Sequence, residues 1–195
     1  MKIALFGGTF DPIHHAHLLL ARDALEQLGI DKVVFIPAAQ SPHKLARLPA
    51  PADARLQMVH AAVAGEEHFK VDDSELHRTG PSFTIDTVEA WRARLPAAEL
   101  YYLVGDDNLR ELHTWRRFEE LRTLVQFVVF GRSGSAAHEH AGFPRLTRHV
   151  DISATEIRER VARGRSIRYL VPDAVLAIIE ARGLYRGTTP SNPTN

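Results

Sequence analysis

Histidines follow a pair of glycines near the start of the chain, in the stretch Gly7-Gly8-Thr9-Phe10-Asp11-Pro12-Ile13-His14-His15-Ala16-His17. Glycine has no side chain, so a ligand can approach the backbone of such a turn closely. Pro12 favours a helix start, because its missing N–H falls where the first helical turn leaves donors unpaired. A helix N-terminus attracts anions, and His14 and His17 would share one face of it. The stretch therefore predicts stabilisation of negative charge on a phosphate.

A second helix start, rich in hydroxyls, occurs far along the chain at Ile152-Ser153-Ala154-Thr155-Glu156-Ile157-Arg158. Ser153 or Thr155 can cap the helix, and Arg158 projects close to the capped end. Hydroxyls, free N–H groups and a guanidinium arranged in this way can bind the β and γ phosphates of a nucleotide. Ser-x-Thr-x-x-Arg alone is a common helix start, so its value comes from its pairing with the N-terminal stretch.

Other interpretations of the histidine cluster stay open. The glycine pair can be only a turn between a strand and a helix. His14, His15 and His17 could bind a metal ion, because imidazole is a common zinc ligand. The chain has no cysteine and no H-E-x-x-H helix, so the usual structural zinc sites lack support. We favour phosphate chemistry and predict no metal ion held by the protein.

Further polar residues follow the ends of predicted strands, which is where ligands bind in an open α/β sheet. His43 and Lys44 occupy the loop after one strand, and Gly105 and Asp107 follow another. A carboxylate such as that of Asp107 can accept two hydrogen bonds from a ribose diol. Without the other motifs, a solvated loop or a helix cap would be the first explanation of these groups.

The stretch Ser82-Phe83-Thr84 predicts another helix start. Ser82 or Thr84 would cap this helix, and its N-terminus would also suit a carboxylate. Trp115, further along, could close the core or stack on an electron-poor ring.

Alternating strand and helix patterns must position all these residues. Apolar runs predict strands at 3–6, 32–37, 69–72, 100–104 and 126–130, and amphipathic stretches predict the helices between and after them. Gly29 and Gly183 end two helices. Residues 135–148 lack periodicity and predict an exposed excursion, after which 149–152 returns to the sheet. The alternation predicts a doubly wound, mostly parallel sheet with helices on both faces. Residues 1–186 would form one domain with a small C-terminal helical portion, and 187–195 a disordered tail.

Composition sets outer limits on function. The chain has 195 residues, enough for one sizeable core, and its 24 Lys plus Arg equal its 24 Asp plus Glu. This balance gives no basic field for nucleic acid or for an anionic membrane. Without cysteine there are no disulfides and no thiol catalysis, and no stretch resembles a signal peptide or a membrane span. We expect a cytoplasmic enzyme.

The N-terminal stretch closely resembles the G-[GS]-[TS]-F-D-P-x-H-x-G-H opening of the nucleotidyltransferases of the H-x-G-H type, most of all bacterial nicotinate-mononucleotide adenylyltransferases. Ala16 stands where that family has glycine. The block at 152–158 is similar to the family's Ile-Ser-[Ser/Ala]-Thr-x-[Ile/Leu]-Arg motif, and weaker matches in the same order extend the resemblance over Met1 to Tyr185.

The resemblance implies a Rossmann-like fold and transfer of the adenylyl group of ATP to nicotinate mononucleotide, with Mg²⁺ accompanying ATP. It leaves homo-oligomerisation open. Nicotinamide mononucleotide, or another phosphate such as phosphopantetheine, remains an alternative acceptor, and a non-catalytic nucleotide sensor an alternative function. At Arg116 the family has a tyrosine whose backbone N–H is used, which arginine also supplies.

The residues that the resemblance assigns fall into three groups. The catalytic residues would be His14, His17 and Arg158. ATP would be bound by Gly7, Gly8, Thr9, Phe10, His14, His17, Gly105, Asp107, Arg132, Ile152, Ser153, Thr155 and Arg158. Nicotinate mononucleotide would be bound by Thr9, His43, Lys44, Thr84, Trp115 and Arg116.

Overall fold

The computed structural model describes residues 1–39, 48–131, 143–148 and 150–187. The predictions for His43, Lys44 and Arg132 lie outside these residues, as does the predicted tail from residue 188 onward. The side chain of Asp107 is likewise outside the described part of the chain.

Six parallel strands form one sheet in the order β3-β2-β1-β4-β5-β6. The order reverses between β1 and β4, which creates a crevice at the carboxyl ends of these two strands. The predicted doubly wound, parallel sheet is therefore confirmed. The strands are β1 (Lys2–Gly8), β2 (Lys32–Pro37), β3 (Phe69–Val71), β4 (Glu99–Gly105), β5 (Gln126–Gly131) and β6 (Arg145–Thr147).

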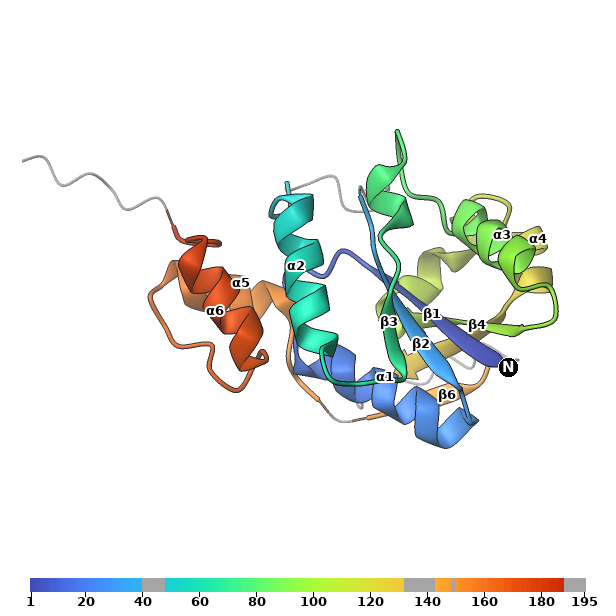
Figure 1. Cartoon of the computed structure of the whole chain (residues 1–195), viewed down its shortest axis with the longest axis horizontal. Helices are drawn as coiled ribbons and strands as arrows, with labels where there is room; N and C mark the ends of the chain where they lie inside the picture. Colours follow the sequence, from blue (N-terminus) through green and yellow to red (C-terminus); the bar gives the residue numbers. More distant parts are fainter. Residues whose placement is uncertain (40–47, 132–142, 149, 188–195) are drawn as a thin grey trace, which may run out of the picture.

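Helices cover both faces of the sheet (Figure 1). Successive β1 side chains alternate between two cores: Ala4 and Phe6 face one, and Ile3 and Leu5 face the other. The helices are α1 (His15–Leu28), α2 (Ala52–Val63), α3 (Thr84–Arg94), α4 (Phe118–Leu124), α5 (Ala154–Ala162) and α6 (Asp173–Ala181), with 3₁₀ turns η1 (Ser74–His77) and η2 (Asp106–Thr114). No helix among the described residues is long and apolar enough to cross a bilayer.

The C-terminal helices α5 and α6 lie beyond α2, at one end of the molecule (Figure 1). Ile157, Val175 and Ile179 join the core that also contains Met58 of α2, and all four side chains are 2% exposed or less. This arrangement confirms the predicted small C-terminal helical portion and brings the start of α5 toward the sheet. The proposed extent of the domain, 1–186, stays a prediction.

Three local predictions are wrong. Helix α1 begins at His15 rather than at Pro12, because His14 is extended (φ −148°, ψ 171°) and Phe10 is left-handed (φ 47°), so the chain turns before it coils. The chain returns to the sheet at β6, not at 149–152, because the backbone N–H of Val129 bonds to the carbonyl of Pro144 (3.0 Å). At α3 neither predicted hydroxyl caps the helix, since Phe83 is the N-cap residue.

Candidate active site

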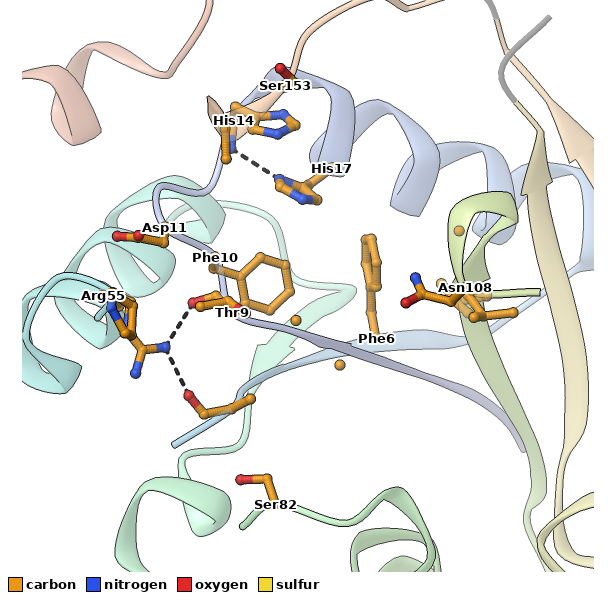
Figure 2. Close-up of a pocket in the computed structure, with 18 of the residues that line it drawn as sticks. Phe6, Thr9, Phe10, Asp11, His14, His17, Arg55, Ser82, Asn108 and Ser153 are labelled. Atoms are coloured by element: carbon orange, nitrogen blue, oxygen red, sulfur yellow. Dashed lines mark hydrogen bonds between the residues drawn. The ribbon is translucent and has the colours of Figure 1, made fainter. Parts of the chain in front are cut away.

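A cavity of about 1320 Å³ opens at the carboxyl edge of the sheet, where the strand order reverses. Figure 2 shows part of its lining, with residues from the turn after β1, from α1, from α2 and from η2 facing one another. The structure thus brings most of the predicted site residues to one cavity. Those that line it are Gly7, Gly8, Thr9, Phe10, His14, His17, Thr84, Gly105, Trp115, Arg116, Ile152, Ser153, Thr155 and Arg158.

The two glycines at the end of β1 are required by packing inside the protein. A Cβ on Gly7 would lie 2.3 Å from the hydroxyl oxygen of Tyr102, and a Cβ on Gly8 would lie 3.0 Å from the ring of Phe10. Both neighbours line the cavity. The sequence predicted that a ligand approaches the backbone of these glycines closely. The structure shows that the side chains of Tyr102 and Phe10 already do so.

The histidine pair lies at the start of α1, with the two rings stacked at a centroid distance of 3.8 Å (Figure 2). The backbone N–H of His14 donates to Nδ1 of His17 over 3.2 Å. An accepting Nδ1 carries no proton, so the N–H that the ring of His17 offers as a donor lies at Nε2.

The end of α1 has fewer backbone donors than the sequence predicted. The N–H of His15 donates to the carbonyl of Leu170 (3.0 Å), and the N–H of His17 donates to the carbonyl of His14 (3.0 Å). An anion at this end would therefore contact the imidazole side chains more than these two amides.

Helix α5 reaches the same cavity through Ser153, Thr155 and Arg158. The hydroxyl of Ser153 accepts from the backbone N–H of Glu156 (3.1 Å), so the predicted cap is confirmed. The Arg158 guanidinium, mostly buried, donates to the carbonyl of Asp11 (2.8 Å) and to the hydroxyl of Thr155 (3.0 Å). Two motifs 147 residues apart are joined directly by this arginine.

The other end of the cavity is aromatic. The hydroxyl of Thr84, at the start of α3, donates to the hydroxyl of Tyr102 (3.4 Å), and Trp115 meets the Tyr102 ring edge-on at 5.8 Å. Trp115 packs against the core, as one of the two interpretations from the sequence predicted, and it also lines the cavity. Its stacking on a ligand ring stays a prediction. The Arg116 guanidinium stacks on Phe83 at 4.6 Å.

Sequence reasoning missed several groups around this cavity. The carboxylate of Asp11 accepts from Ala50 N–H (3.1 Å) and from the Tyr185 hydroxyl (2.7 Å). Arg55 is 1% exposed and bonds to backbone carbonyls. Its signal in the sequence is a charged residue on the apolar stripe of α2, three and four residues before Met58 and Val59.

Glu75 is a further buried acid that lines the cavity. Its carboxylate accepts from the hydroxyl of Thr87 (2.6 Å). The hydroxyl of Ser82, which also lines the cavity, accepts from the backbone N–H of Ala39 (3.1 Å). Burial raises the pKa of the Glu75 carboxyl, against the opposing effect of hydrogen bonds from Thr87 and Ser82. Burial also raises the pKa of Tyr102.

Groups of three His, Asp or Glu side chains able to hold a metal ion do not occur in the part of the chain that the structure describes. His14, His15 and His17 do not form such a group.

The fold and the cavity agree with comparisons to known proteins. The model of the cytidylyltransferase-like family matches residues 5–160, and the chain belongs to this family. The structure of Plasmodium falciparum nicotinic acid mononucleotide adenylyltransferase complexed with NaAD is similar in fold, with a TM-score of 0.79 at 18% identity, over 94% of this chain and 97% of that one.

Sequence relatives narrow the family further. A probable nicotinate-nucleotide adenylyltransferase of Thermus thermophilus is 45% identical, over 95% of this chain and 100% of that protein. One of Gemmatimonas aurantiaca, with the same name, is 46% identical, over 95% and 93%. The predicted resemblance to nicotinate-mononucleotide adenylyltransferases is confirmed.

Proposed function

We propose that this protein transfers the adenylyl group of ATP to nicotinate mononucleotide, forming nicotinate adenine dinucleotide and releasing pyrophosphate. The observation that carries the proposal is one cavity with two chemically different ends. The histidine pair and Arg158 lie at one end, and Thr84 and Trp115 at the other. The first suits a triphosphate, and the second suits an aromatic ring that carries an acid group.

The reaction needs positioning and charge stabilisation rather than a covalent intermediate. An oxygen of the 5'-phosphate of nicotinate mononucleotide attacks the α-phosphorus of ATP, and the bond to the bridging oxygen of pyrophosphate breaks. Negative charge grows on the oxygens around the α-phosphorus and on the leaving group. Preorganised donors in a cavity stabilise this charge most effectively. His17 Nε2–H, His14 and Arg158 are the donors that we assign to it.

The acceptor would be recognised at the start of α3. The nicotinate ring stacks on Trp115, and its carboxylate accepts from Thr84 and from the backbone N–H of Arg116. A carboxylate gains more than an amide from donors at a helix N-terminus, so the acid is the preferred acceptor. The assignments of Gly105 and Asp107 to ribose, and of His43, Lys44 and Arg132 to phosphates, belong to the same proposal.

Mg²⁺ enters the proposal as a companion of ATP. The described residues offer no three-ligand cluster to hold an ion, so the triphosphate oxygens would carry it, and no step above passes through it. The proposal also includes the cytoplasmic location that we expect from the sequence. It leaves open whether the protein forms a homo-oligomer.

The test is pyrophosphate release with ATP and Mg²⁺, with nicotinate mononucleotide and nicotinamide mononucleotide offered in parallel. We expect a strong preference for the acid. Equal use of both would refute the assignment of the α3 end and favour the alternative acceptor. Binding of ATP without pyrophosphate release from any acceptor would instead favour the nucleotide sensor.

A further inference from the structure

Arg55 is a buried cation whose partners are backbone carbonyls from three separate segments. Its Nε donates to Ala50 (3.0 Å), and one terminal nitrogen donates to both Thr9 (2.7 Å) and Ala38 (2.8 Å). Thr9 follows β1, Ala38 follows β2, and Ala50 precedes α2. Figure 2 shows the guanidinium beside Thr9, with Asp11 and Phe10 on the same turn. A single side chain thus ties together three walls of the cavity.

The contact with Thr9 fixes the orientation of one peptide group. In a trans peptide the N–H points opposite to the C=O, so the N–H of Phe10 points away from Arg55. Phe10 has φ 47°, a conformation that a phenylalanine does not prefer, so the turn needs support from its surroundings. Within the described residues this N–H donates no backbone hydrogen bond. Thr9 and Phe10 both line the cavity.

Arg55 is also linked to Asp11, on the far side of the Thr9–Phe10 turn, through the backbone of Ala50. The carbonyl of Ala50 accepts from Arg55, while the N–H of the same residue donates to the carboxylate of Asp11 (3.1 Å). The carbonyl of Asp11 in turn accepts from Arg158. The position of Arg158, which we assign to the phosphates, therefore depends on the same turn. Lysine cannot reproduce the whole arrangement, because its single ammonium cannot stand both at Nε, which bonds to Ala50, and at the terminal nitrogen, which bonds to Thr9 and Ala38.

We propose that Arg55 is a positioning residue for adenylyl transfer: it holds the Thr9–Phe10 peptide so that the Phe10 N–H is presented to the phosphates of ATP. The inference rests on the proposed function, which already assigns Phe10 to ATP through the family resemblance; what it adds is the buried arginine that orients this backbone donor through the carbonyl of Thr9. Such a donor acts on the charge of the transition state, so its misplacement lowers kcat more than it raises KM.

Arg92 provides a matched control. It lies on α3, and its guanidinium also donates to backbone carbonyls, those of Ala98 (2.7 Å) and Leu124 (2.6 Å). Ala98 immediately precedes β4 and Leu124 ends α4 just before β5, so both lie at the amino ends of strands, opposite the cavity. Arg92 is not among the residues that line the cavity. Arg92→Lys therefore loses a similar structural contact without touching the site.

The experiment compares Arg55→Lys, Arg92→Lys and the unmodified protein by thermal unfolding and by steady-state kinetics below the lowest melting temperature. Both variants should melt at lower temperature. Arg55→Lys should lose about 100-fold in kcat, with KM for nicotinate mononucleotide changed less than about threefold. Arg92→Lys should keep kcat. Equal kcat in the two variants would overturn the inference, whereas lack of product from the unmodified protein would overturn the proposed function instead.

A second measurement needs no variant. In the unmodified protein, binding of α,β-methylene ATP should shift the NMR resonance of the Phe10 amide and slow its hydrogen exchange. A Phe10 amide that does not respond, while amides elsewhere in the cavity do, would overturn the inference even if Arg55→Lys does not fold.

Discussion

Replacement of His17 separates its structural role from its chemical one. Nδ1 of His17 accepts from the backbone N–H of His14, and this leaves Nε2–H as the donor. Asparagine carries its Oδ1 on the same carbon that carries Nδ1 in histidine, so His17→Asn can keep the first contact while losing the second. His17→Ala loses both. The two variants should therefore differ in stability and agree in activity.

The magnitudes follow from the contacts. Loss of a hydrogen bond at a helix start costs about 1 kcal/mol. We expect His17→Ala to be less stable than His17→Asn by that amount, or roughly 2–4 °C in melting temperature for a chain of this size. Loss of a preorganised donor to developing charge costs about 100- to 1000-fold in kcat. Both variants should show this loss.

The assay is pyrophosphate release at saturating ATP and nicotinate mononucleotide, paired with urea unfolding of each variant. A His17→Asn protein that retains kcat within about threefold would refute the role of Nε2–H as a transition-state donor. Equal unfolding free energies of the two variants would refute the stabilising role of the Nδ1 contact. Arg92→Lys is a suitable control for unspecific loss of stability.

Three further outcomes are expected. Gly7→Ala places a methyl group against the Tyr102 hydroxyl and should cost about 1–3 kcal/mol of unfolding free energy. Adding Tyr102→Phe, which removes that hydroxyl, should recover part of this loss, and strictly additive effects of the two changes would contradict the clash. Ser153→Ala should cost about 1 kcal/mol, measured by urea unfolding, because the N–H of Glu156 loses its acceptor. The pKa of Glu75 is raised in the folded protein, so its protonated carboxyl stabilises the folded state. This contribution to the free energy of unfolding is complete below the ordinary pKa of 4.5 and is lost as the pH rises through the folded-state pKa. The free energy of unfolding of Glu75→Gln should lack this pH dependence, measured by urea unfolding from below pH 4.5 to above it. If the free energies of the wild type and the variant change with pH in the same way, Glu75 is not the source of the dependence.

Much of the fold could be predicted from short stretches of sequence. The strand Lys32–Pro37 was predicted with the bounds that the structure shows, because a buried parallel strand is a continuous apolar run. Gly29, with φ 61°, ends α1 as predicted, since glycine adopts the left-handed conformation without a steric cost. The strand β6 was missed because it is three residues long and Leu146 is its one apolar residue.

The candidate site was predictable as a set of motifs but not as an arrangement. The proposed phosphate-binding chemistry was suggested by the residue types and spacing of His14, His17 and the Ser153 block, because helix starts and their anion affinity are local properties. Thr84 and Trp115 are far apart in the sequence, and only the family resemblance assigned them to the same pocket. What it could not supply was the contact of Arg158 with the carbonyl of Asp11 across 147 residues.

Local patterns in the sequence were enough to predict the strands other than β6, most of the helices and the residue types of the candidate site. The folded chain was needed to show that β1 and β4 are neighbours, that Arg55 donates to the carbonyl of Thr9 and that Tyr185 donates to Asp11. The physical reason is the range of the interactions. Periodicity and capping act within a few residues, whereas buried polar contacts form between segments that meet only after the order of strands in the sheet is fixed.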